Sequence, residues 1–148
     1  MIIISHGGNL NGNAQTANTQ TAVDQALAAG FDAMVDVWLE SGQYMIGIDS
    51  PTEAVGDSWL RRPRMWCRAR SGEALQKMQE DMIHCFWMDE SPYTVTSRNG
   101  LLCNTGFYLP KGIATILGGP GELQGGKDSI AGVCTDNPIA WREWMIMS

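Results

Sequence analysis

The stretch Gly30-Phe31-Asp32-Ala33-Met34-Val35-Asp36-Val37-Trp38-Leu39 alternates as a β-strand does, since successive side chains of a strand point to opposite faces. One face is apolar throughout, and we expect it to pack against helices. It consists of Phe31, Ala33, Val35, Val37 and Leu39. The other face consists of Asp32, Met34, Asp36 and Trp38. An acid that points inward needs a partner, a metal or water. The partner of Asp36 is therefore the first question that this sequence raises.

The segment before this strand predicts a β-loop-α-β unit. Residues 2–5 form a continuous apolar run that is typical of a strand buried on both faces. Thr19 or Asn18 can cap a helix that runs to Ala29, and Gly30 supplies a C-terminal stop. A strand, a helix and a second strand in this order imply that the two strands are parallel.

Further apolar runs predict about eight strands but few full helices. The chain of 148 residues suits one domain, whereas an ordinary (β/α)8 barrel needs ~250 residues. We therefore expect an α/β fold in which residues 1–148 form a single compact barrel domain. It would be a reduced TIM-like (β/α)8 barrel with several helices missing or shortened. The strands of its one parallel sheet are expected around Ile2, Val35, Ile46, Ile83, Val95, Ile113 and Val133.

The composition argues against nucleic acid and membranes as partners. The net charge is -6 and the pI is near 4.7, whereas nucleic-acid binders carry basic patches. No segment approaches the ~20 apolar residues of a membrane helix, and the N-terminal residues lack the basic region of a signal peptide. The 4 Cys residues show no C-x-x-C pair and no zinc spacing, so they are interpreted as buried free thiols. These features predict a cytoplasmic protein and leave its oligomeric state open.

Chemistry in a barrel sits at the carboxyl ends of the strands, and the predicted strand ends carry several polar side chains. Each has an ordinary structural alternative. His6 can cap a turn, Asp49 can begin one, and the pair Arg68 and Arg70 can form a solvated edge. Asp136 is more readily interpreted as a cap of the last helix. The full set of strand-end residues is His6, Asp36, Asp49, Arg68, Arg70, Met88, Ser97 and Asp136.

Short motifs occur in a fixed order along almost the whole chain. They are Ser5-His6-Gly7-Gly8-Asn9-Leu10-Asn11-Gly12, the Gly30–Leu39 stretch, Ile46-Gly47-Ile48-Asp49-Ser50-Pro51, Trp66-Cys67, Phe86-Trp87, Tyr93-Thr94-Val95-Thr96-Ser97 and Gly132-Val133-Cys134-Thr135-Asp136. In this order they resemble the glycerophosphodiester phosphodiesterase family, in a short form. The resemblance implies a compact barrel with a metal-assisted phosphodiester site at its strand ends.

The chain departs from that family at the positions that carry the family's chemistry. The family's His-Ala-Lys after Trp66-Cys67 is replaced by Arg68-Ala69-Arg70. The family's other Arg, Glu and His residues are replaced by Gly7, Ala17, Met34, Ile48, Met88 and Gly118. A hard divalent cation needs several oxygen ligands, and Asp36 is the one remnant. We therefore expect no cofactor, with a residual magnesium or calcium ion as the alternative.

These replacements predict an apolar pocket for a small-molecule ligand. Its expected substrate-binding residues are Met34, Trp38, Ile48, Trp66, Arg68, Arg70 and Met88. The framework motifs persist while the site is emptied, so we interpret the pocket as deliberately engineered, with a natural pseudoenzyme as the alternative.

A lone carboxylate in an apolar pocket is a stronger base than one in water. We therefore expect proton abstraction from a small aromatic molecule, with Asp36 or Asp49 as the base and His6 as its partner. Two alternatives remain. One is a binding protein without turnover, and the other is residual phosphodiester hydrolysis in which Arg68 and Arg70 hold the phosphate.

Overall fold

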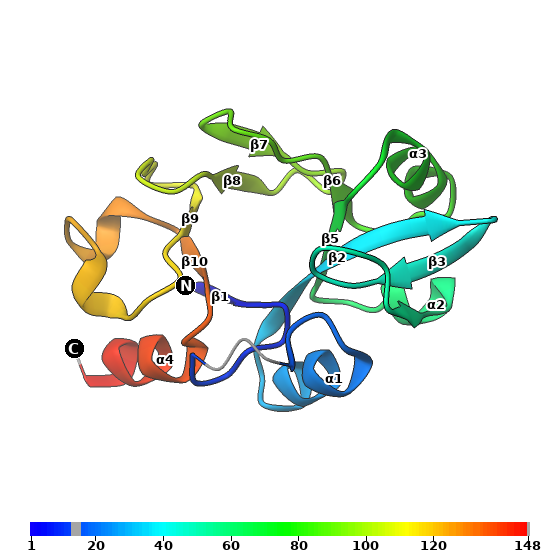
Figure 1. Cartoon of the computed structure of the whole chain (residues 1–148). Helices are drawn as coiled ribbons and strands as arrows, with labels where there is room; N and C mark the ends of the chain where they lie inside the picture. The colour runs from blue at the N-terminus through cyan, green and yellow to red at the C-terminus, as the bar shows by residue number, and fades with distance from the viewer. Residues whose placement is uncertain (13–15, 148) are drawn as a thin grey trace.

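The computed structural model describes residues 1–12 and 16–147 (Figure 1). The fold is mixed α/β, with a curled sheet and four α-helices in the described residues. The elements in chain order are β1 (Ile2–His6), α1 (Gln20–Ala28), β2 (Asp32–Glu40), β3 (Gln43–Ile46), β4 (Glu53–Ala54), α2 (Asp57–Leu60), β5 (Met65–Ala69), α3 (Gly72–Glu80), β6 (Cys85–Phe86), β7 (Tyr93–Val95), β8 (Leu101–Cys103), β9 (Ile113–Thr115), η2 (Pro120–Glu122), η3 (Lys127–Ser129), β10 (Gly132–Thr135) and α4 (Pro138–Met147).

One sheet joins the strands of the described residues. Its order is β4-β3-β2-β1-β10-β9-β8-β7, and β5 pairs with both β2 and β6. The pairs β1–β2, β2–β5, β5–β6, β1–β10, β10–β9 and β9–β8 are parallel. The sheet curls into a half-barrel, so it has an inner and an outer face (Figure 1).

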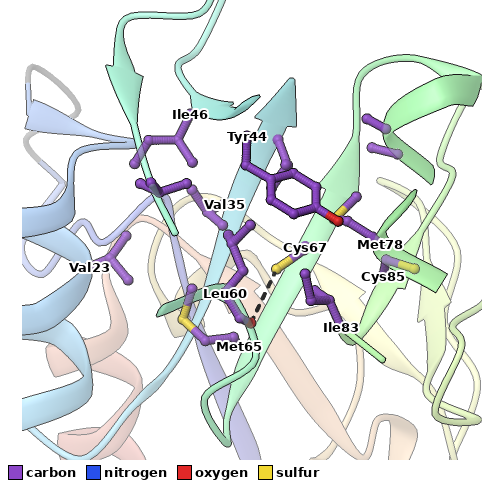
Figure 2. Packing of buried hydrophobic residues seen from close by; sticks show 14 of the residues in the cluster. Val23, Val35, Tyr44, Ile46, Leu60, Met65, Cys67, Met78, Ile83 and Cys85 are labelled. Carbon is purple, nitrogen blue, oxygen red and sulfur yellow. Dashed lines mark hydrogen bonds between the residues drawn. The ribbon is translucent and has the colours of Figure 1, made fainter. Parts of the chain in front are cut away.

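Helices cover part of the outer face, as the apolar face of the Gly30–Leu39 stretch predicts. Val35 and Val37 of β2 pack in one cluster with Val23 of α1 and Met78 of α3 (Figure 2). Cys67 belongs to this cluster, and its Sγ lies 3.9 Å from the carbonyl oxygen of Leu60. All the described cysteines are free and buried, which confirms the prediction of buried free thiols.

The inner face is filled by a second apolar cluster, so the centre of the half-barrel is packed. Its buried members are Ile4, Met34, Trp66, Phe86, Leu102, Ile113 and Cys134. Met34 comes from the inward face of β2, opposite to Val35, as strand alternation requires. A ligand-binding site made of polar side chains is therefore expected at the ends of the strands, outside this apolar cluster.

Helix α1 forms where the sequence predicts it, because both of its ends carry the expected signals. The Oγ1 of Thr19 accepts a hydrogen bond from the backbone N–H of Ala22 at 3.2 Å. At the other end Gly30 has a φ of 96°, and its N–H donates to the carbonyl of Leu27 at 3.0 Å. Strand β2 then begins two residues later and runs parallel to β1.

The prediction that all strands are parallel is wrong for two of them. Strand β3, which contains Ile46, pairs antiparallel with β2, and β7, which contains Val95, pairs antiparallel with β8. Ser41 and Gly42 both have positive φ, at 49° and 78°, and such a two-residue turn joins antiparallel strands. Ile83 was also expected in a strand, but it precedes β6. Within the described residues, no helix is long and apolar enough to cross a membrane.

Candidate functional site

Strand β2 brings Asp36 to the inner face near the carboxyl ends of the parallel strands. Asp36 is only 8% exposed. Its backbone N–H donates to the Oδ1 of Asn18 at 2.7 Å, and the Asn18 N–H donates to the carbonyl of Gly7 at 2.7 Å. The loop after β1 therefore fixes the position of Asp36 through Asn18.

The partner of Asp36 is an arginine at the end of β5, the strand that pairs with β2. Nη1 of Arg70, directly after β5, donates to Oδ2 of Asp36 at 3.2 Å. The guanidinium of Arg70 also stacks on the ring of Trp38, 4.9 Å from its centroid. The indole N–H of Trp38 donates to the carbonyl of Gly47 at 2.9 Å. One face of the Trp38 ring is thus occupied by Arg70, which limits its use for stacking a flat ligand.

A second arginine on the same strand face has spare hydrogen-bonding capacity. Nη2 of Arg68 donates to the carbonyl of Met88 at 3.1 Å. Its Nε is buried and has no hydrogen-bond partner among the described residues. A buried guanidinium donor without a partner costs free energy. An oxygen-bearing ligand or a water molecule would remove that cost.

His6, at the end of β1, forms a pair with Asp136, which follows β10. His6 Nδ1 lies 3.0 Å from Asp136 Oδ1, and the same oxygen accepts a hydrogen bond from Asn9 Nδ2 at 2.7 Å. The Asn9 Oδ1 is buried and has no partner among the described residues. The interpretation of Asp136 as a helix cap is therefore wrong, because its carboxylate binds His6 and Asn9.

These residues form one group at the strand ends, which we call the rim: His6, Asp36, Arg68, Arg70, Met88 and Asp136. Burial raises the pKa of Asp36 above the ordinary value, while the positive charges of Arg68, Arg70 and His6 act in the opposite direction. The net shift is upward, so desolvation outweighs the attraction of the cations. The rim is thus a partly desolvated cluster in which basic side chains surround one buried acid.

Two further predicted site residues are exposed and take no part in the ion pairs of the rim. Ile48 is 43% exposed, and Asp49 beside it is also exposed, on the loop that follows β3. Strand β3 turns away from the parallel strands as the second arm of a hairpin. The structure does not bring Asp49 to Asp36, and Ile48 does not form part of the buried inner cluster.

Trp66 lies in the inner apolar cluster rather than in the rim, two residues before Arg68 on the same strand face. Its indole N–H donates to the Asp32 carboxylate at 2.9 Å, and its ring centroid lies 4.4 Å from that of His84. The His84 Nε2 lies 2.7 Å from the Thr96 Oγ1. These contacts hold Trp66 within the apolar cluster. Sequence reasoning did not identify His84, because a lone histidine in an apolar run has no motif around it.

Met34 and Met88 occupy the boundary between the apolar cluster and the rim. Met34 is 7% exposed, and Met88 packs against the same cluster while its carbonyl binds Arg68. The resemblance led us to expect a metal ligand in place of Met34 and a histidine in place of Met88. Neither offers a hard oxygen to a divalent cation.

The described residues contain no cluster of metal-ligating side chains. Within residues 1–12 and 16–147, no three His, Cys, Asp or Glu side chains gather closely enough to hold one. A carboxylate does lie close to Gly118, where the resemblance led us to expect a Glu. It belongs to Glu122, whose carboxylate occupies the place that a side chain on residue 118 would fill.

Comparisons with family models, with curated proteins and with solved structures found no match to this chain. The fold and the rim are therefore the basis on which a function can be argued.

Proposed function

We propose that the rim binds a small anionic molecule of the phosphate-ester class, and that binding needs no divalent cation. The observation that carries this proposal is the Arg68 Nε, which is buried and has no partner among the described residues. Arg70 and His6 add positive or protonatable groups from neighbouring strands. Guanidinium groups bind phosphate oxygens through directed, charge-assisted hydrogen bonds.

In this proposal the chain is a reduced TIM-like (β/α)8 barrel whose strand-end site has lost its hydrolytic metal chemistry. The parallel strands, the curled sheet and the position of the rim support it. The resemblance to glycerophosphodiester phosphodiesterases also favours a phosphate ester as the ligand. The protein then acts as a small-molecule binding protein or pseudoenzyme.

Binding is favoured over base catalysis by Asp36 because that carboxylate is already engaged. Arg70 holds its Oδ2 at 3.2 Å, and a base in an ion pair must give up part of that interaction when it accepts a proton. The Asp36 carboxylate instead holds Arg70 in place and partly neutralises the rim. An arriving anion can then compete for the Arg70 guanidinium.

The proposal is tested by titrating the protein with glycerol 3-phosphate in the presence of EDTA and following tryptophan fluorescence, since Trp38 contacts Arg70. Arg68→Gln should weaken binding by at least about tenfold, because charge-assisted hydrogen bonds contribute ~1.5–3 kcal/mol. Arg98→Gln is the matched control, because Arg98 is exposed and binds the carbonyl of Met82. Equal affinity of the Arg68 and Arg98 variants would contradict the proposal.

The contact between His6 and Asp136 favours a second candidate function, in which His6 abstracts a proton from a small aromatic molecule. The Asp136 carboxylate, 3.0 Å from Nδ1 of His6, orients the imidazole. In this case His6→Gln should abolish turnover of an activated benzisoxazole, a probe for carbon-acid proton abstraction. If Asp36→Asn abolishes turnover while His6→Gln keeps it, the base is Asp36, one of the two acids that the sequence offers for this role.

A further inference from the structure

A cavity outside the rim contains a carboxylate that none of the preceding chemistry uses. The cavity has a volume of about 360 Å³ and lies at the carboxyl end of β9. Its lining includes Thr105, Tyr108, Leu117, Gly118, Glu122 and Gln124. This volume falls within the range of ligand pockets, ~300–1,000 Å³.

The Glu122 carboxylate is held over the backbone of Gly118 by the short turn η2. The N–H of Glu122 donates to the carbonyl of Gly119 at 3.1 Å, and the N–H of Leu123 donates to that of Pro120 at 3.1 Å. The carbonyl of Gly118 is itself fixed, since it accepts from the indole N–H of Trp141 at 2.9 Å and from the Thr135 hydroxyl at 2.9 Å. The Glu122 carboxylate therefore lies against a backbone segment that these hydrogen bonds hold in place.

This carboxylate, on an exposed residue, has no counter-ion among the residues that the structure describes. Among the described residues Glu122 takes part in no ion pair, and its side chain makes no hydrogen bond. The rest of the cavity wall combines the half-buried Tyr108 ring, the Leu117 side chain and the amide of Gln124. An anion beside an aromatic ring and an aliphatic wall matches an organic ammonium group, which carries both a charge and an apolar chain.

We infer that this cavity binds a small organic amine in its protonated form, with Glu122 as the counter-ion. The inference concerns the end of β9 and does not depend on anion binding at the rim. The ammonium group would lie against the Glu122 carboxylate, and its alkyl portion would contact Tyr108 and Leu117. No covalent step is involved.

Gly118 provides a variant that moves the carboxylate without removing it. A Cβ on residue 118 would overlap with the carboxylate of Glu122, which is the free end of a flexible side chain. Gly118 is not among the residues of positive φ, so alanine fits its backbone. Gly118→Ala should therefore displace the Glu122 carboxylate while the fold is kept.

The experiment is a titration with n-butylamine near neutral pH, followed through the backbone amide resonances of Gly118 and Glu122. We expect saturable shifts of these amides. Affinity should fall by up to about fivefold in Glu122→Gln and in Gly118→Ala, because this is near the upper limit for an exposed ion pair. Glu143→Gln, an exposed change on α4, should leave the affinity unchanged.

Three results would overturn the inference. The first is the absence of saturable shifts, and the second is unchanged affinity in Glu122→Gln. The third is equal binding of n-butanol, which has the same alkyl chain without the charge and would show an apolar site only. Anion binding at the rim is measured separately through Arg68, so failure of one site leaves the other test intact.

Discussion

Arg70 Nη1 lies 3.2 Å from Asp36 Oδ2, and this contact joins the ends of two neighbouring parallel strands. It answers the question raised by an acid on the inner face of β2. The Asp36 side chain is 12% exposed and that of Arg70 is 27% exposed, so the pair is only partly screened by water. The same guanidinium stacks on Trp38. The buried acid is thus paired with a cation from an adjacent strand.

Breaking this pair from one side should cost more than removing it altogether. Arg70→Gln leaves the Asp36 carboxylate buried without its cation, and we expect unfolding free energy to fall by about 1–3 kcal/mol. In the double variant Arg70→Gln with Asp36→Asn, the buried charge is gone, so part of that loss should be recovered. Urea unfolding of the four proteins in this cycle measures the coupling. Strictly additive effects would show that the contact contributes nothing to stability.

The raised pKa of Asp36 predicts a pH dependence of stability. Burial is the main cause of the shift. Above the unfolded value of 3.8 the folded protein holds the proton more tightly than the unfolded chain, so stability falls as pH rises from 3.8 through the folded pKa. Asp36→Asn should remove this part of the slope in urea midpoints measured across the acid range. An unchanged slope would mean that Asp36 titrates as it does in the unfolded chain.

His84 should give a slope of the opposite sign. Burial lowers its pKa below 6.5, although the contact with the carbonyl of Met65 acts the other way. Between the folded pKa and 6.5 the unfolded chain binds more protons, so this contribution to stability is complete above 6.5 and is lost as pH falls. His84→Gln keeps a side-chain amide near the Thr96 hydroxyl but cannot titrate. Its stability should therefore change less than that of the parent protein between about pH 7 and pH 5.

The described donor set also predicts the response to divalent cations. Asp36 is already paired with Arg70. Met34 and Ala17 offer no oxygen ligand at the two positions where the resemblance led us to expect carboxylates. Millimolar magnesium or calcium should therefore hardly change the thermal midpoint. A site saturated at a hundredfold excess over Kd would add ~2.7 kcal/mol to stability. A stabilisation of that size would show that a metal site exists and that our interpretation of the replacements is wrong.

The outline of the fold could be predicted because two kinds of signal are local. The alternation in β2 assigns Val35 to the helix layer and Met34 to the inner cluster, and Thr19 with Gly30 marks the ends of α1. The direction of a strand is harder to predict from local sequence, because the alternation around Ile46 would be the same in a parallel and in an antiparallel pair. The direction of β3 depends instead on the turn Ser41-Gly42, whose two positive φ angles join antiparallel strands.

The rim was predictable only in part, because its contacts join residues far apart in the sequence. Strand ends pointed to His6, Asp36, Arg68 and Arg70, and the structure gathers these four. The contact between His6 and Asp136 spans 130 positions, so the local helix-cap signal at Asp136 outweighed it. Glu122 could not be related to Gly118 from the sequence, because the relation depends on how η2 folds back.

The most direct test of anion binding at the rim is the Nε–H resonance of Arg68 in a ¹H–¹⁵N spectrum recorded during titration with glycerol 3-phosphate in EDTA. This N–H is buried and has no partner among the described residues, so a phosphate oxygen that binds it should move its proton resonance strongly downfield in a saturable manner. The Nε–H of the exposed Arg98 serves as the internal control and should stay in place. An Arg68 resonance that does not move at saturating ligand, or that moves only together with Arg98, would contradict the proposal that the rim is an anion-binding site.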